Sequence, residues 1–217
     1  MIAVVDYHKG NLKSVERGLI CAGGEAFITD DPARIATADA IVLPGVGAYA
    51  DAANTMVELG QMDVLRERAA AGVPFLGICL GLHLMFEGGV EDAPLDEAGN
   101  VVPVEGLGMI PSIVGALPRT DAAGAKYKIP HVGWNNVNYT KESPLFAGVP
   151  DGEYFYFTHS YAAPESDCTI ATATHSIEFP CAVQVGENLF GVQFHPEKSS
   201  DAGQAVLRNF VNICAQA

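Results

Sequence analysis

An apolar run that breaks abruptly at a cysteine between two glycines constrains this chain more than any other feature. Residues 73–78 have the pattern of a strand buried on both faces, and residues 80–87 can continue compactly only as a helix. Cys79 stands at the corner, with Gly77 and Gly81 two residues away on either side. Such a strained turn needs neighbours without Cβ, and the helix N-terminus that follows stabilises a thiolate. We interpret Cys79 as a nucleophile; the alternative is a buried structural cysteine.

Composition narrows the possible partners and compartment. Lys and Arg number 12 against 26 Asp and Glu, and the net charge of −14 argues against binding to nucleic acid or to anionic membranes. No Ser/Gly/Pro-rich linker divides residues 1–217, so one domain is predicted. There is no signal-peptide pattern and no apolar run long enough to span a bilayer, and the five cysteines are scattered without C-x-x-C spacing. A cytoplasmic location is therefore expected.

Alternating strand and helix patterns predict an α/β fold: a central, mostly parallel sheet flanked by helices, with antiparallel additions. Asn11 is placed to cap the first helix, and the acidic segment 88–105 is expected to be a solvated surface excursion. The expected strands are 2–6, 25–29, 40–43, 73–78, 133–137, 154–157, 169–173, 182–185 and 189–194. The expected helices are 12–22, 48–71, 80–87 and 201–214.

A glycine-rich loop, residues 44–49, follows the strand expected at 40–43. In open α/β sheets ligands bind at the carboxyl ends of strands. The loop lacks the Lys-Ser/Thr of a P-loop and the three-glycine spacing of a dinucleotide fingerprint. We therefore expect it to offer a backbone N–H to an oxyanion, the alternative being a plain strand-to-helix connection.

His195 offers the base that a cysteine nucleophile needs. It follows the strand expected at 189–194, and the rigid Pro196 separates it from Glu197. Glu197 could accept a hydrogen bond from one ring nitrogen while the other faces Cys79. Alone, each residue is more simply a strand-end histidine or a helix-start acid, but with the cysteine turn they predict a Cys79–His195–Glu197 triad. No paired metal motif is present, so neither a metal nor a cofactor is predicted.

These motifs resemble those of the class I, triad-type glutamine amidotransferases. Residues 77–81 and 193–197 carry the general likeness. Other segments resemble the branch of that family that forms the glutaminase subunit of imidazole glycerol phosphate synthases in histidine biosynthesis. Those segments are 6–7, 10–12, 44–48, 130–135, 156–157, 159–161 and 195–199. The resemblance therefore runs the length of the chain and implies the fold of that family.

The resemblance implies an amidase reaction on glutamine. Cys79 would attack the side-chain carboxamide, and backbone N–H groups of Leu80 and Val46 would hold the oxyanion. His195 would protonate the departing ammonia and then activate the water that hydrolyses the thioester. The family pattern assigns the α-carboxylate and α-amino end of glutamine to Gly47, Ser160 and Tyr161.

The resemblance also implies a partner, since ammonia must reach its acceptor unprotonated. In this family the partner is a (β/α)₈-barrel cyclase that forms a heterodimer with the glutaminase. It uses ammonia to make imidazole glycerol phosphate and an aminoimidazole carboxamide nucleotide. The residues that match interface positions are Asn11, His131, Trp134, Tyr156 and Lys198.

One substrate-binding position departs from the family pattern. Four residues after the nucleophile the family usually has glutamine, and this chain has His83. A ring nitrogen of histidine donates or accepts a hydrogen bond, whereas an amide group does both. The affinity for glutamine and its pH dependence are therefore expected to differ. Three other functions stay open: the glutaminase subunit of another amidotransferase, a Cys-His-Glu hydrolase of another amide or ester, and a non-catalytic binding protein on the same fold.

Overall fold

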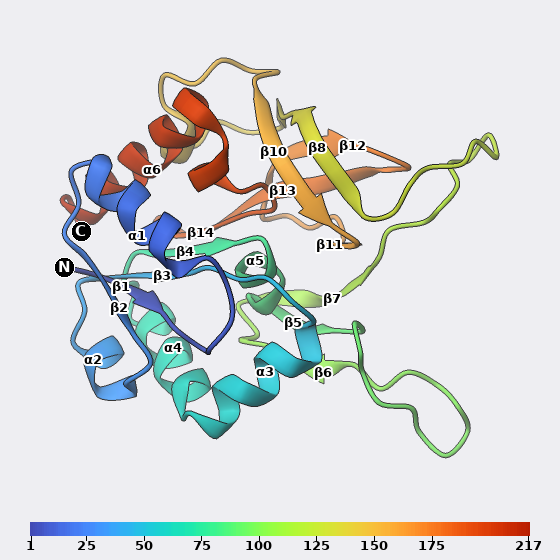
Figure 1. The fold of residues 1–217 in the computed structure, drawn as a ribbon, viewed down its shortest axis with the longest axis horizontal. Helices are drawn as coiled ribbons and strands as arrows, with labels where there is room; N and C mark the ends of the chain where they lie inside the picture. Colours follow the sequence, from blue (N-terminus) through green and yellow to red (C-terminus); the bar gives the residue numbers. More distant parts are fainter.

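The computed structural model describes residues 1–217, and an eight-stranded sheet forms its centre (Figure 1). The strand order is β2-β1-β3-β4-β14-β13-β12-β9. Its parallel strands are β1 (Ile2–Val5), β2 (Ala26–Thr29), β3 (Ala40–Leu43), β4 (Phe75–Ile78) and β14 (Leu189–Val192). The antiparallel strands are β13 (Glu178–Val185), β12 (Thr169–Thr174) and β9 (Asn138–Tyr139). The predicted parallel sheet with antiparallel additions is confirmed.

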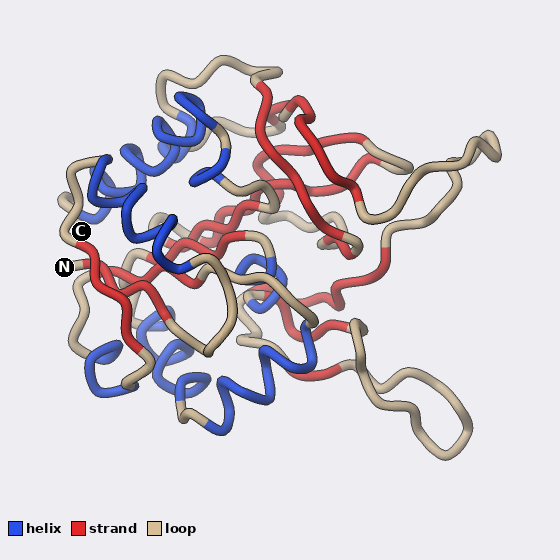
Figure 2. Tube along the Cα trace, in the orientation of Figure 1, coloured by secondary structure: helices blue, strands red, loops and turns tan.

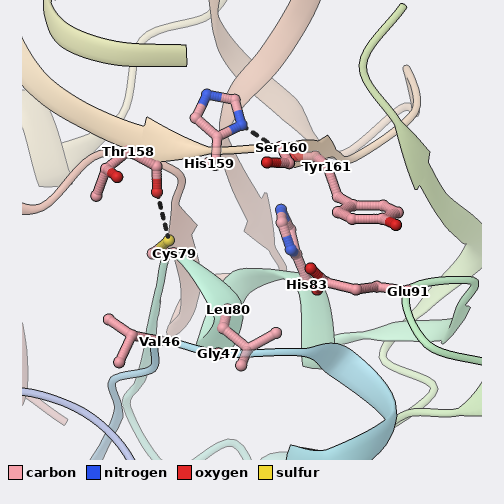
Figure 3. A pocket seen from close by; sticks show the side chains of 10 residues that line it. All are labelled: Val46, Gly47, Cys79, Leu80, His83, Glu91, Thr158, His159, Ser160 and Tyr161. Carbon is pink, nitrogen blue, oxygen red and sulfur yellow. Dashed lines mark hydrogen bonds between the residues drawn. The ribbon is translucent and has the colours of Figure 1, made fainter. Parts of the chain in front are cut away.

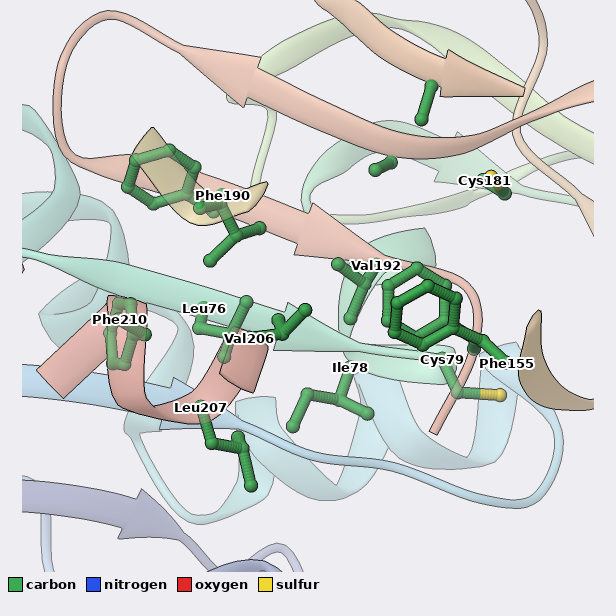
Figure 4. Packing of buried hydrophobic residues seen from close by; sticks show 14 of the residues in the cluster. Leu76, Ile78, Cys79, Phe155, Cys181, Phe190, Val192, Val206, Leu207 and Phe210 are labelled. Atoms are coloured by element: carbon green, nitrogen blue, oxygen red, sulfur yellow. The ribbon is translucent and has the colours of Figure 1, made fainter. Parts of the chain in front are cut away.

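Helices cover both faces of this sheet, because its central strands are buried on both sides (Figures 1 and 2). On one face Leu76 and Ile78 pack with Val206, Leu207 and Phe210 in a single cluster (Figure 4). On the other face Phe75 packs within a second cluster. The first face carries α1 (Leu12–Cys21) and α6 (Ser200–Cys214); the second carries α2 (Pro32–Ala36), α3 (Tyr49–Glu58), α4 (Gln61–Ala70) and α5 (Leu80–Leu84). None of the helices combines the length and apolar character needed to cross a membrane.

Two smaller sheets lie beside the carboxyl end of β4. One pairs β8 (His131–Asn136) with β10 (Tyr154–His159). The other has the order β11-β7-β5-β6, with β11 at Tyr161–Ala162, β7 at Ile110–Ala116, β5 at Phe86–Gly89 and β6 at Val104–Glu105. Two short 3₁₀ helices, η1 (Pro144–Phe146) and η2 (Pro196–Lys198), complete the chain.

Several predicted boundaries are wrong for identifiable reasons. The helix expected over 48–71 is broken by Gly60, whose φ of +69° ends α3 and starts α4. The helix expected over 80–87 ends at Leu84, because Phe86 begins β5 and pairs with Ile110 of β7. Strand β7 and helix α2 were not predicted. Asp31 begins α2 by accepting a hydrogen bond from the backbone N–H of Ala33 at 2.9 Å.

The acidic segment 88–105 is only partly the surface excursion that its composition indicates. Most residues from 94 to 103 are exposed in a loop that extends away from the body of the molecule (Figure 2). Gly88 and Gly89, however, are buried in β5. At the first helix, Asn11 occupies the expected N-cap position, but its side chain makes no capping hydrogen bond.

Candidate active site

Cys79 lies in a sharp turn between β4 and α5, as its flanking glycines predict. Its φ is +54°, a left-handed conformation that costs a residue with a side chain about 1–3 kcal/mol. A Cβ on Gly77 would lie 2.6 Å from the carbonyl oxygen of Gly81, and one on Gly81 would overlap the carbonyl of Leu43. Glycine at both positions therefore lets α5 turn back closely over the sheet and hold the cysteine at its edge.

The register between β4 and β14 brings His195 to the same edge. Val192 pairs with Ile78, and the backbone N–H of Cys79 donates to the carbonyl of Val192 at 2.8 Å. The chain then runs through His195 into η2, where Glu197 turns back toward the ring. His195 Nδ1 lies 2.9 Å from Glu197 Oε1, and the two side chains are only 3% and 2% exposed.

The surroundings of His195 favour its charged form. Burial is the strongest single influence and disfavours the imidazolium, but hydrogen bonds and charges from Cys79 and Glu197 together outweigh it. They raise the pKa of His195 to about 9. Its Nδ1 faces Glu197, so the buried Nε2 is the ring nitrogen that remains for Cys79, whose sulfur lies 3.8 Å from the carbonyl oxygen of Thr158. The arrangement can therefore hold a thiolate beside a protonated base and pass the proton on through Nε2.

A pocket of about 210 Å³ opens over the Cys79 sulfur (Figure 3). It gathers residues from the glycine-rich loop, from α5 and from the end of β10. Among its lining residues are all six that were predicted around the nucleophile: Val46, Gly47, Leu80, His83, Ser160 and Tyr161. The pocket residues that sequence reasoning missed are Glu91, Thr158 and His159.

Glu91 brings the one carboxylate of the pocket lining. Its Oε2 accepts a hydrogen bond from the backbone N–H of Tyr49 at 3.1 Å, and its partial burial raises the pKa of the carboxyl group. In sequence it is one of several acids of the segment 88–105, and no spacing distinguishes it from the others. Only the return of the chain through β5 places it at the pocket.

The glycine-rich loop is fixed against the body of the protein beside Cys79. The buried Tyr7 hydroxyl donates to the carbonyl of Pro44 at 2.9 Å, and a Cβ on Gly45 would overlap that hydroxyl. Gly47 has a φ of +106°, which a residue with a side chain rarely adopts. Leu80 is the first residue of α5, where N–H groups have no partner within the helix. Unpaired backbone donors can therefore face the pocket from two sides.

His83 points into the pocket from α5 and is neutral (Figure 3). Complete burial lowers its pKa to about 4, although a hydrogen bond with Gln193 acts in the opposite direction. Its Nε2 lies 2.6 Å from Gln193 Oε1. An amide oxygen only accepts, so Nε2 carries the proton and Nδ1 is left as an acceptor. Gln193 was not singled out from the sequence.

The sheet of β8 and β10 turns an exposed face outward beside the site. Trp134 lies opposite Tyr156 across the two strands, with their rings edge to face at 73° and the centroids 6.2 Å apart. Trp134 is 52% exposed, and Lys198 Nζ lies 6.0 Å from the Tyr156 ring centroid. Asn11 is also exposed, at the start of α1. Four of the five residues matched to a partner interface are therefore at least partly open to solvent.

His131, the fifth, is buried and connects instead to the pocket wall. Its Nδ1 lies 2.9 Å from His159 Nε2, and His159 Nδ1 lies 2.7 Å from the carbonyl oxygen of Tyr161. Since a carbonyl only accepts, His159 carries its proton on Nδ1 and accepts from His131. Burial first, and then the nearby His175, lower the pKa of His131 to about 4. No group of three or more His, Cys, Asp and Glu side chains is arranged to hold a metal ion.

Comparison with known proteins places this geometry in a family. The family model for glutamine amidotransferase class-I matches residues 3–214. The imidazole glycerol phosphate synthase subunit HisH of Moorella thermoacetica is 44% identical, the match covering 100% of this chain and 96% of the relative. The HisH subunit of Shouchella clausii is 41% identical, with 97% of each chain covered, and that of Natronomonas pharaonis is 42% identical, with 99% and 95% covered.

Solved structures show the same fold at lower identity. A glutamine amidotransferase crystal structure superposes with a TM-score of 0.71 at 17% identity, covering 99% of this chain and 100% of the other. The glutaminase domain of Trypanosoma brucei CTPS, solved with bound acivicin, superposes with a TM-score of 0.63 at 17% identity, covering 99% and 93%. The predicted fold class is thereby confirmed.

Proposed function

This chain belongs to the glutamine amidotransferase class-I family, and we propose that it is the glutaminase subunit of an imidazole glycerol phosphate synthase. It hydrolyses glutamine to glutamate and ammonia with Cys79, His195 and Glu197. The observation that carries the proposal is the cysteine turn at the floor of the pocket, beside a buried His195–Glu197 pair that is held at 2.9 Å. Relatives that are named as HisH subunits, and that match over 96% and 97% of their own length, support the choice of reaction and pathway.

The reaction begins with the Cys79 thiolate attacking the carboxamide carbon of glutamine. The oxyanion that forms accepts hydrogen bonds from the N–H of Leu80 and, once the glycine-rich loop is turned, from that of Val46. The C–N bond then breaks, His195 Nε2 gives its proton to the leaving nitrogen, and a γ-glutamyl thioester remains with free ammonia. His195 next takes a proton from water, and the hydroxide attacks the thioester. Glutamate leaves, and the thiolate is restored beside the imidazolium.

The rest of the pocket orients the amino-acid end of glutamine. Gly47, Ser160 and Tyr161 line the same pocket as Cys79, and they would hold the α-carboxylate and α-amino groups. Glu91 adds a carboxylate that would pair with the α-ammonium group of glutamine. An amide substrate without an amino-acid end would lack this ammonium group. His83 faces the carboxamide region from α5.

A (β/α)₈-barrel cyclase subunit would cover the exposed face formed by Val132, Trp134, Tyr154 and Tyr156. This face adjoins the site, since the carbonyl of Thr158, two residues beyond Tyr156 in β10, lies 3.8 Å from the Cys79 sulfur. Ammonia released there would enter the partner before water could protonate it. Asn11, Trp134, Tyr156 and Lys198 would contact the partner directly. His131 would act from behind the face, through His159.

The test is glutamate release from glutamine by this chain mixed with the cyclase subunit and its nucleotide substrate. Turnover that is lost in Cys79→Ala and kept in Cys21→Ala, an exposed cysteine on α1, would support both the reaction and the partner. Equal background rates for wild type and Cys79→Ala would refute the glutaminase and favour a binding protein. Turnover of other amides or esters with none of glutamine would indicate a different hydrolase.

A further inference from the structure

Gln193 joins His83 to the sulfur of Cys79. Its side chain is completely buried at the end of β14, next to the cysteine turn. Gln193 Nε2 lies 3.7 Å from Cys79 Sγ, and Gln193 Oε1 lies 2.6 Å from His83 Nε2. His83 and Cys79 are 4 residues apart along the chain and face the same pocket (Figure 3). One amide group therefore contacts both the nucleophile and the residue that replaces the usual glutamine.

The Gln193 amide could present either its oxygen or its N–H groups to the sulfur, and the two orientations differ in the form of Cys79 that they stabilise. A thiol can donate to an amide oxygen, so a neutral Cys79 would tolerate either orientation. A thiolate only accepts, and it is stabilised only when the amide presents its N–H groups. In the structure Gln193 Oε1 faces His83 Nε2 and the N–H groups of the amide face the sulfur, and donation from His83 Nε2 stabilises this orientation. The other titratable side chains around this sulfur are His195, backed by Glu197, and Tyr7 beneath the glycine-rich loop.

We propose that Gln193 is a positioning residue for the Cys79 thiolate, and that His83 acts on the nucleophile by orienting Gln193. This deepens the proposed function and rests on Cys79 being its nucleophile. His83 then replaces glutamine without loss of the orienting contact, because a ring N–H and an amide N–H both donate to Oε1. The reactivity of Cys79 toward any electrophile should consequently depend on both residues, with or without glutamine in the pocket.

The experiment is the pH dependence of Cys79 alkylation by iodoacetamide in the full chain without glutamine, followed by mass spectrometry of the Cys79 peptide. Gln193→Met keeps the length of the side chain and removes its N–H groups. We expect the midpoint of the profile to rise by about one pH unit, and the rate below the midpoint to fall about tenfold. His83→Leu should shift the midpoint in the same direction, whereas His83→Gln, which keeps a donor, should restore the wild-type profile.

Gln61→Met is the matched control for losing a buried amide. Gln61 is also completely buried, but it donates to the backbone carbonyls of Asp6 and Asp30 at 2.8 and 3.0 Å. The Cys79 alkylation profile of Gln61→Met should match that of the wild type. Profiles of Gln193→Met and His83→Leu that coincide with this control would overturn the inference. Because the two His83 variants leave Gln193 in place, they decide the question even if Gln193→Met does not fold.

The proposed function is tested separately, by glutamate release in Cys79→Ala. A catalytic Cys79 whose alkylation ignores Gln193 and His83 would refute this inference alone. Selective alkylation that depends on Gln193 in a chain without glutaminase turnover would leave the positioning role in place and refute the function.

Discussion

Replacing Glu197 by glutamine should lower the pKa of His195, so that the ring loses its charge at a lower pH than in the wild type. The variant keeps the shape of the side chain and an oxygen that can accept from Nδ1, which lies 2.9 Å away. It removes the negative charge. Because the two side chains are only 3% and 2% exposed, water screens that charge poorly.

The pKa of His195 gives the size of the effect. A rise from the usual 6.5 to about 9 favours the imidazolium by about 3 kcal/mol. Burial opposes this charge, so Cys79 and Glu197 must offset burial and supply the net rise. If they contribute equally, losing Glu197 removes more than half of the rise and brings the pKa below about 8. With Cys79→Ala as well, burial acts alone and the pKa falls below 6.5.

The sign of the linkage follows from the direction of this pKa. The folded-state value lies above the ordinary one, so the imidazolium stabilises the fold fully below about pH 6.5. That stabilisation is lost as the pH rises through about 9 in the wild type, and at lower pH in Glu197→Gln.

The assay is an NMR titration of the His195 Cε1–H resonance, assigned by its loss in His195→Asn. Glutamate release with the cyclase partner should fall by about 10²–10⁴-fold in Glu197→Gln, because glutamine neither fixes the tautomer and orientation of the ring nor stabilises the imidazolium as the carboxylate does. Glu187→Gln, at an exposed turn, is the control and should change neither reading. A His195 that still titrates near 9 in Glu197→Gln would refute the reasoning.

Three other changes test the fold, the buried imidazole and the partner face. Gly81→Ala should unfold the chain, or lower the free energy of unfolding measured in urea by more than about 3 kcal/mol, because its Cβ would overlap the backbone of β3. Gly115→Ala is the control and should be tolerated, because the space around its Cβ is open. Because the pKa of His83 is lowered to about 4 in the folded protein, the free energy of unfolding decreases as the pH falls from about 6.5 toward 4. His83→Gln should therefore raise the free energy of unfolding by about 2–3 kcal/mol at about pH 4.5 and leave it unchanged at pH 7. Trp134→Ala should weaken cyclase binding about 30-fold in calorimetry with the melting temperature unchanged. Val57→Ala, at an exposed position on α3, is the control and should leave the affinity for the cyclase unchanged. Unchanged cyclase affinity in Trp134→Ala would move the interface elsewhere.

Local sequence determined the elements whose signals are contained within a few residues. The apolar run before Cys79, with glycine on both sides, was enough to predict a strand, a sharp turn and a helix, because backbone sterics alone exclude most alternatives. The close spacing of His195 and Glu197 in the chain likewise predicted their contact. The alternation of apolar strands and amphipathic helices predicted the parallel sheet and its covered faces.

Only the tertiary structure decided the features that depend on contacts between distant parts of the chain. Pairing of β5 with β7 ended the helix that local pattern extended to residue 87, and it carried Glu91 from an acidic surface segment to the pocket. His83 meets Gln193 across 110 residues, through the register of β4 and β14. His131, which the segment 130–135 placed at a partner surface, packs inside against His159. No local propensity encodes such contacts, because each depends on how separate elements pack and on the buried hydrogen bonds that must be satisfied once they do.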